Sequence, residues 1–164
     1  FNIARDVEID FQNNELNAGS TATSRNYALE VYEGTTVIKN ANFTRAGICA
    51  EGDANVVFEN GVINHKPERT SRYIFCALGN SIITVEDGTF QNDNARNSYI
   101  WVDGNAKVYV KGGTFKGTSN TKIYSSNGGQ VIITGGTFSF DPSAWVAEGY
   151  VATKNGSTSA RTAQ

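Results

Sequence analysis

Several residue types are scarce in this chain. Its 164 residues include no methionine, two prolines, two cysteines and one histidine. The cysteines, Cys49 and Cys76, are too few for a disulfide scaffold and lack the spacing of a metal site. No apolar run approaches the roughly 18 residues that a membrane-spanning helix needs, so we expect no membrane insertion.

Charge is low as well. Charged residues make up 18% of the chain and the formal net charge is -2. This balance directs the chain toward neither nucleic acid nor an anionic membrane surface. The chain starts at Phe1 without a basic and then apolar leader, and we interpret it as a fragment of a longer protein.

The residue types that carry catalysis are sparse. His65, the one histidine, has no evident orienting carboxylate, and we interpret it as a surface-loop residue. Asp53, Asp87 and Asp103 stand beside glycines, where aspartate commonly supports a turn. The sequence shows no Ser-His-Asp set, P-loop or dinucleotide fingerprint and no cluster of carboxylates for Ca²⁺. We therefore expect no enzymatic activity, no cofactor and no metal.

What the chain does contain is glycine and a repeated motif. Seventeen glycines are present, and the ending Gly-Thr-Phe occurs in the segments 85–90, 110–115 and 133–138. The closing residues Phe90, Phe115 and Phe138 are roughly 25 residues apart, a period that is typical of a solenoid. Functional surfaces of a solenoid lie on its faces and edges.

The register of the repeat predicts three apolar columns that point inward. Residues alternate between apolar and polar around each motif, which is the pattern of a half-buried strand. Only Thr36 breaks the set, and a turn shortened by one residue would place Val37 inward instead. The closing column is Leu16, Phe43, Ile63, Phe90, Phe115 and Phe138; the column five residues earlier is Phe11, Ile38, Phe58, Val85, Val110 and Ile133; the column seven residues earlier is Ile9, Thr36, Val56, Ile83, Val108 and Val131.

A further strand in each repeat completes a three-sided coil. Together the patterns predict an all-β fold, a right-handed parallel β-helix of about six coils over residues 1–140. This further strand is apolar on both faces. We expect one of its columns to face outward as a contact surface between identical rods in a homotrimer, the alternative being ordinary core with scattered surface apolar residues. The predicted interface column is Leu29, Cys49, Cys76, Trp101 and Tyr124. Cys49 and Cys76 then stack on adjacent coils, which permits a disulfide, but the geometry of a parallel ladder is not ideal for one and we expect free thiols.

Longer connections, residues 64–73 and 91–98, fall at one corner of the predicted coil. Basic residues gather in the same corner, and such an edge suits an anionic glycan or an acidic partner. The alternative is a plain row of solvated loops. The basic edge consists of Arg45, Lys66, Arg69, Arg72, Arg96, Lys116 and Lys122.

The C-terminal part differs from the repeats. Asp141 followed by Pro142 predicts the start of a short helix, with Gly149 just past its end. We expect residues 141–156 to cap the open end of the last coil through Trp145, Val146 and Tyr150. Residues 157–164 are polar and predict a flexible tail or linker.

Two segments resemble known proteins. "GGTF" followed by "DPSAWVAEGY" resembles the terminal module of right-handed β-helix proteins of gut Bacteroidetes and their phages. "ALEVYEGTTVIKNANF" and "GQVIITGGTF" are similar to the pectate-lyase-like superfamily. That group includes polysaccharide lyases and hydrolases, adhesins and phage appendages, so the fold alone does not choose the function. The Asn-x-Asp, Asp-Asp and Gly-His-Gly signatures of its hydrolases are missing here.

The resemblance implies a non-catalytic structural segment of an oligomeric phage fibre or appendage. Such a segment would lie at the virion surface, contact other virion or surface proteins and meet host glycans. The alternative is a secreted or cell-surface bacterial β-helix that binds carbohydrate as an adhesin. A second alternative is an enzyme resembling polysaccharide lyases or hydrolases.

Overall fold

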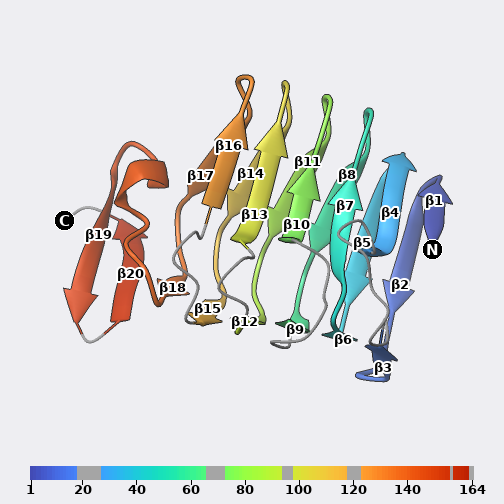
Figure 1. Ribbon diagram of the computed structural model, residues 1–164, viewed down its shortest axis with the longest axis horizontal. Helices are drawn as coiled ribbons and strands as arrows, with labels where there is room; N and C mark the ends of the chain where they lie inside the picture. Colours follow the sequence, from blue (N-terminus) through green and yellow to red (C-terminus); the bar gives the residue numbers. More distant parts are fainter. Residues whose placement is uncertain (18–26, 66–72, 94–97, 118–122, 156, 163–164) are drawn as a thin grey trace.

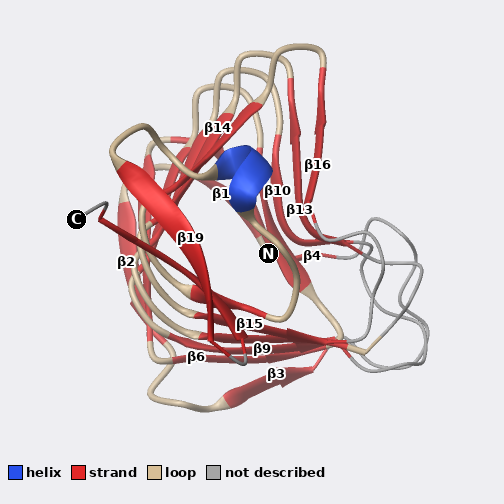
Figure 2. Ribbon diagram, turned by 90° about the vertical axis from the view of Figure 1, so that its left-hand side faces the viewer, coloured by secondary structure: helices blue, strands red, loops and turns tan. Residues whose placement is uncertain are grey.

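The computed structural model describes residues 1–17, 27–65, 73–93, 98–117, 123–155 and 157–162. Within them the chain forms a β-solenoid built from three parallel sheets, as the sequence predicts. The windings follow one another along the rod from β1 at one end to β18 near the other (Figure 1). Seen along the rod, the sheets form three sides around a common interior (Figure 2).

Each sheet takes one strand from each successive winding. Sheet A contains β1 (Asn2–Ala4), β4 (Tyr27–Glu33), β7 (Gly47–Ala50), β10 (Tyr73–Ala77), β13 (Ser98–Asp103) and β16 (Ile123–Ser126). Sheet B contains β2 (Val7–Asp10), β5 (Thr35–Lys39), β8 (Asn55–Phe58), β11 (Ile82–Val85), β14 (Lys107–Val110) and β17 (Gln130–Ile133). The parallel strands of sheet C are β3 (Glu15–Asn17), β6 (Ala41–Thr44), β9 (Gly61–His65), β12 (Thr89–Asn92), β15 (Thr114–Gly117) and β18 (Thr137–Phe138).

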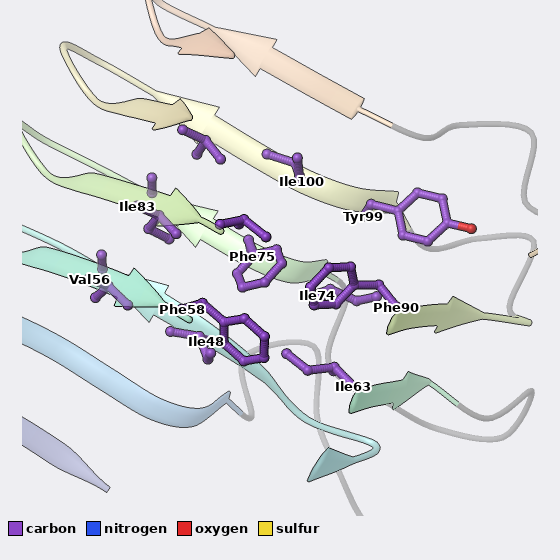
Figure 3. Close-up of a cluster of buried hydrophobic side chains, with 14 of the residues drawn as sticks. Ile48, Val56, Phe58, Ile63, Ile74, Phe75, Ile83, Phe90, Tyr99 and Ile100 are labelled. Carbon is purple, nitrogen blue, oxygen red and sulfur yellow. The ribbon is translucent and has the colours of Figure 1, made fainter. Parts of the chain in front are cut away.

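The interior is a continuous apolar core made by the predicted columns. Phe90 lies between Phe58 and Phe115, with ring centroids 5.5 and 4.7 Å away, and Phe115 continues the stack to Phe138 at 5.0 Å. Figure 3 shows how side chains from neighbouring strands point toward one another in this core. Thr36 keeps its predicted inward place and is fully buried, while Val37 is only half-buried, so no shortened turn is present.

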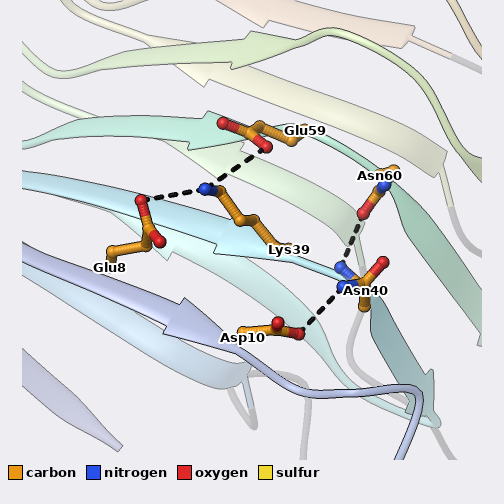
Figure 4. Close-up of polar contacts among 6 residues, drawn as sticks. All are labelled: Glu8, Asp10, Lys39, Asn40, Glu59 and Asn60. Atoms are coloured by element: carbon orange, nitrogen blue, oxygen red, sulfur yellow. Dashed lines mark hydrogen bonds and ion pairs between the residues drawn. The ribbon is translucent and has the colours of Figure 1, made fainter.

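Ion pairs and hydrogen bonds on the outside of sheet B connect the side chains of the first windings. Lys39 Nζ lies 3.0 Å from a carboxylate oxygen of Glu8 and 3.9 Å from one of Glu59 (Figure 4). At the end of the same strands, Asn40 Nδ2 donates a hydrogen bond to Asp10 Oδ1 at 2.9 Å. This hydrogen bond and a second one from the Gln12 backbone N–H, at 2.8 Å, lower the pKa of Asp10. Facing side chains on adjacent strands therefore match in charge and hydrogen bonding.

The C-terminal cap differs from its prediction. The helix is a single 3₁₀ turn, η1 (Ser143–Trp145), preceded by Pro142. Asp141 lies one residue earlier than an N-cap, although its Oδ1 accepts a hydrogen bond from the Ser143 N–H at 3.0 Å. Val146 is extended and forms a parallel bridge with Ile133, because the open edge of β17 offers backbone partners that a longer helix would leave unused.

Trp145 and Val146 pack against the core at this end, which is the capping role predicted for them. Tyr150 instead begins β19 (Tyr150–Asn155), which pairs antiparallel with β20 (Ser157–Thr162). Strand β20 in turn pairs antiparallel with β18 and extends sheet C. Residues 157–162, predicted as a flexible tail, therefore form a strand, because β19 pairs with them along their length and β18 pairs with Thr158 and Ser159.

The described residues contain no helix long and apolar enough to cross a bilayer.

Candidate functional site

The outer face of sheet A carries the predicted interface column, with one correction. Cys49, Cys76, Trp101 and Tyr124 stand in register on successive strands. Leu29 does not belong to this column, because a β-bulge between Tyr27 and Leu29 shifts the register. Leu29 pairs with Ile48, is 1% exposed and lies in the core; Glu30 faces Cys49 in its place. We call Glu30, Cys49, Cys76, Trp101 and Tyr124 the outer column.

A second column covers part of the outer column. Tyr27 and Tyr73 begin the strands β4 and β10, and Tyr73 is itself buried. The ring centroids of Tyr73 and Trp101 are 5.2 Å apart. Cys49 and Cys76 are each 1% exposed, so they are not an accessible surface of the single chain, contrary to the prediction. The sequence prediction followed two neighbouring columns of these strands and assigned no role to the tyrosines that begin β4 and β10.

The accessible aromatic part of the outer column is its last two residues. Tyr124 is 51% exposed on β16, the edge strand of sheet A. Trp101 is half-buried, and its Nε1 donates a hydrogen bond to Ser126 Oγ at 3.3 Å. An aromatic pair of this kind, apolar with a polar tip, is typical of contact surfaces.

The opposite end of the outer column is acidic. Glu30 Oε2 accepts a hydrogen bond from the Tyr32 hydroxyl at 2.7 Å, and this bond raises the pKa of Tyr32 to about 12. Glu51 Oε1 accepts a weak hydrogen bond from Cys49 Sγ at 3.7 Å. The face therefore changes from carboxylates near the N-terminal windings to aromatic rings near the C-terminal ones.

The thiols of Cys49 and Cys76 lie together beneath this face. A hydrogen bond to Cys76, followed by burial, raises the pKa of Cys49. Burial likewise raises the pKa of Tyr27, whose side chain also hydrogen-bonds to Cys76. Both cysteines are free thiols in this structure.

The structure places only two members of the predicted basic edge. Arg45 follows β6, and its Nη1 donates a hydrogen bond to Asn17 Oδ1 at 3.3 Å. Lys116 is exposed on β15, three strands further along sheet C, or about 14 Å at normal strand spacing. The structure therefore does not bring Arg45 and Lys116 together. The remaining members, Lys66, Arg69, Arg72, Arg96 and Lys122, lie outside the described residues.

His65 is not a surface residue as predicted. Strand β9 continues to His65, whose inward side chain is fully buried opposite the buried Asn92 of β12. The alternation that places Ile63 inward also places His65 inward, two residues later. Burial lowers the pKa of His65 to about 4, against a smaller opposite effect of a hydrogen bond to the Ala46 backbone.

The carboxylates beside glycines are held within turns. Asp103 Oδ1 accepts hydrogen bonds from the Gly104 N–H at 2.7 Å and from Asn127 Nδ2 at 2.8 Å. Asp87 Oδ1 accepts from the Gly88 N–H at 2.7 Å, and Asp53 Oδ1 accepts from an asparagine amide of the next winding at 3.0 Å. Among the described residues, no group of three or more His, Cys, Asp or Glu side chains is arranged to hold a metal ion.

Each end of the solenoid has a hollow. Phe1, Ile3, Val7 and Phe11 are among the residues around a cavity of about 490 Å³ at the N-terminal end. A groove of about 420 Å³ separates β17 from the C-terminal turn and is lined in part by Gln130, Ile132 and Trp145. Neither hollow contains an aspartate, glutamate or histidine in its lining.

No family model, curated protein or solved structure matches this chain.

Proposed function

We propose that this chain is a non-catalytic structural segment of an oligomeric fibre or appendage, trimeric and carried on a phage virion. The observation that supports it best is the outer column of sheet A, where Trp101 and Tyr124 present aromatic surface on neighbouring parallel strands. Elongated subunits that meet through such a face, in heterologous contacts around a three-fold axis, close into a ring.

The acidic end of the outer column indicates which end of this face lies in the proposed contact. Glu30 and Glu51 lie near one end of the face and Tyr124 at the other. Burying a carboxylate without a partner is costly, so the aromatic end is the better candidate for the centre of the contact. In the proposed trimer, Tyr124 lies at the contact and Glu30 stays in water.

Tyr124→Glu tests the contact. The substitution adds charge at a position that is 51% exposed, so the fold tolerates it while the buried contact does not. We expect the wild-type chain to sediment as a trimer and the variant to sediment as a monomer. Val62→Glu is the matched control, because Val62 is 42% exposed on sheet C and should leave the trimer intact.

Far-ultraviolet circular dichroism would verify that both variants retain the fold. Trp101→Glu is a less clear test, because Trp101 also packs against Tyr73 within the chain. A wild-type chain that sediments as a monomer at high concentration contradicts the proposal. A Tyr124→Glu variant that remains trimeric contradicts it equally.

The proposal also includes contact with host surface glycans at the edge that carries Lys116. A binding screen with uronate and neutral polysaccharides would test this part, and charge reversal at Lys116 should weaken binding to the acidic members. The same incubation separates the alternatives. Binding without cleavage is compatible with a fibre or an adhesin, whereas release of oligosaccharides would show that the segment is catalytic.

A further inference from the structure

Two thiols meet directly under the outer face of sheet A. Cys49 on β7 and Cys76 on β10 are register partners in a parallel pair. Facing Cα atoms on adjacent parallel strands are about 4.8 Å apart, within the roughly 4.4–6.8 Å that a disulfide spans. The two side chains lie close enough for Cys76 to raise the pKa of Cys49, and each cysteine is 1% exposed. The backbone therefore already holds the two sulfur atoms as neighbours.

The surroundings of the pair favour a neutral product. The Tyr27 side chain hydrogen-bonds to Cys76, and Glu51 Oε1 accepts from Cys49 Sγ at 3.7 Å. A dry site beside a carboxylate disfavours thiolates, which metal binding would require. It also disfavours a stable charged adduct such as glutathione. A disulfide carries no charge and takes less space than two thiols.

We propose that Cys49 and Cys76 form a disulfide when the chain folds in an oxidising environment. With glutathione disulfide as the oxidant, the Cys49 thiolate attacks one sulfur and releases a glutathione thiolate, leaving a mixed disulfide. The Cys76 thiolate then attacks the Cys49 sulfur and displaces the second glutathione. The two cysteines lose two protons and two electrons, and one glutathione disulfide becomes two glutathione molecules.

The bridge would join two consecutive windings near the middle of the rod. It closes a loop that contains all of strands β8 and β9 and the connection to β10. A closed loop of this length restricts the unfolded chain, so the disulfide stabilises the folded state. The site is buried within the single chain, and its oxidation does not depend on the proposed trimer.

Refolding in a glutathione redox buffer tests the proposal. The unfolded wild-type chain is refolded at a series of ratios of glutathione to glutathione disulfide, and each reaction is quenched with acid. Free thiols are then labelled with N-ethylmaleimide under denaturing conditions, and the mass of the intact chain is measured by mass spectrometry. At oxidising ratios we expect a monomer that has lost two hydrogens and carries neither maleimide nor glutathione. Cys49→Ala and Cys76→Ala are matched controls, each of which should keep one maleimide or one glutathione.

Urea denaturation gives a second, independent readout. The oxidised wild-type chain should unfold at a higher urea concentration than the reduced chain, whereas Cys49→Ala/Cys76→Ala should unfold at the same concentration in both buffers. Two maleimide-reactive thiols, or stable glutathione adducts, in the wild-type chain at the most oxidising ratio overturn the proposal. The proposal is also overturned if the oxidised chain has a urea unfolding midpoint no higher than that of the reduced chain, because the folded register would then not accommodate the disulfide.

Discussion

Thr36 places a polar side chain in an otherwise apolar core column. Its side chain is fully buried in a column whose neighbours in register are Val7 and Val56. Its Oγ1 is buried and has no hydrogen-bond partner. A hydroxyl without a partner in an apolar interior retains its desolvation cost, on the order of 1–3 kcal/mol. The position is therefore a weak point of the core.

Thr36→Val should stabilise the protein. The substitution replaces the unpaired hydroxyl with a methyl group of similar size, and we expect the free energy of unfolding to rise by about 1 kcal/mol. Urea denaturation at neutral pH measures the change. Thr35→Val is the control, because Thr35 is only half-buried and its Oγ1 accepts a hydrogen bond from Asn55. An unchanged or lower stability of Thr36→Val would show that the hydroxyl is satisfied.

The sequence determines the inward residues well and the outward ones poorly. The inward columns follow from alternation alone, since each strand must bury one side. The outer column needed two further facts: the bulge that turns Leu29 inward, and the tyrosines that cover Cys49 and Cys76. A bulge adds one residue to a strand without a mark in the hydrophobic pattern, so alternation counted across it fails.

Successive windings approach each other most closely where glycines turn the chain. Gly61 begins β9 with a φ of 136°, and a Cβ there would lie 2.4 Å from the Ala41 carbonyl oxygen of the winding below. That distance is shorter than any van der Waals contact, and backbone cannot move away as a side chain can. The close spacing between β6 and β9 therefore requires a residue without a side chain at position 61.

Gly61→Ala should destabilise the protein by roughly 3 kcal/mol, through backbone strain and the clash together. Gly149→Ala is the matched control. Gly149 also has a positive φ, of 82°, but a Cβ there would meet nothing within 4 Å. The control should therefore lose only about 1 kcal/mol from backbone strain. Equal losses in the two variants, measured by urea denaturation, would contradict the close contact between windings.

Element boundaries were harder to predict than element types. The longer connection predicted for residues 64–73 includes His65, yet pairing with β12 extends β9 to His65. Residues 157–162 have the composition of a tail but pair through their backbone with β18 and β19. In both cases pairing with another strand supplies the hydrogen bonds, and such pairing overrides local composition.

At the scale of the whole molecule, the buried histidine couples stability to pH. Burial lowers the pKa of His65 to about 4 in the folded state, below an ordinary value near 6.5 in the unfolded chain. Between these values the unfolded chain binds a proton that the folded chain does not. Stability therefore falls as the pH decreases from about 6.5 to about 4, by a total of about 3 kcal/mol from this group.

His65→Asn should remove this part of the pH dependence. Asparagine already occupies the register position of the next winding, at Asn92, and is buried there. We expect the wild-type chain to lose stability over this range more steeply than the variant, and the two curves to be parallel above about pH 7. Urea midpoints at half-unit pH intervals measure the difference. Parallel curves throughout would show that the His65 pKa is not lowered.

The two ends of the rod are chemically different. At the N-terminal end, β1, β2 and β3 are the edge strands of their sheets, and residues of β1 and β2 line a largely apolar cavity. At the C-terminal end, η1 and the antiparallel pair β19 and β20 lie over the last winding (Figure 2).

The antiparallel pairing of β20 with β18 has an evolutionary consequence. Duplication of one repeat unit adds another layer wherever a parallel strand follows a parallel strand. Beyond β20 that rule no longer holds, since the strand direction has reversed. Within the described residues, a duplicated unit therefore continues the parallel order only where it is inserted before β18.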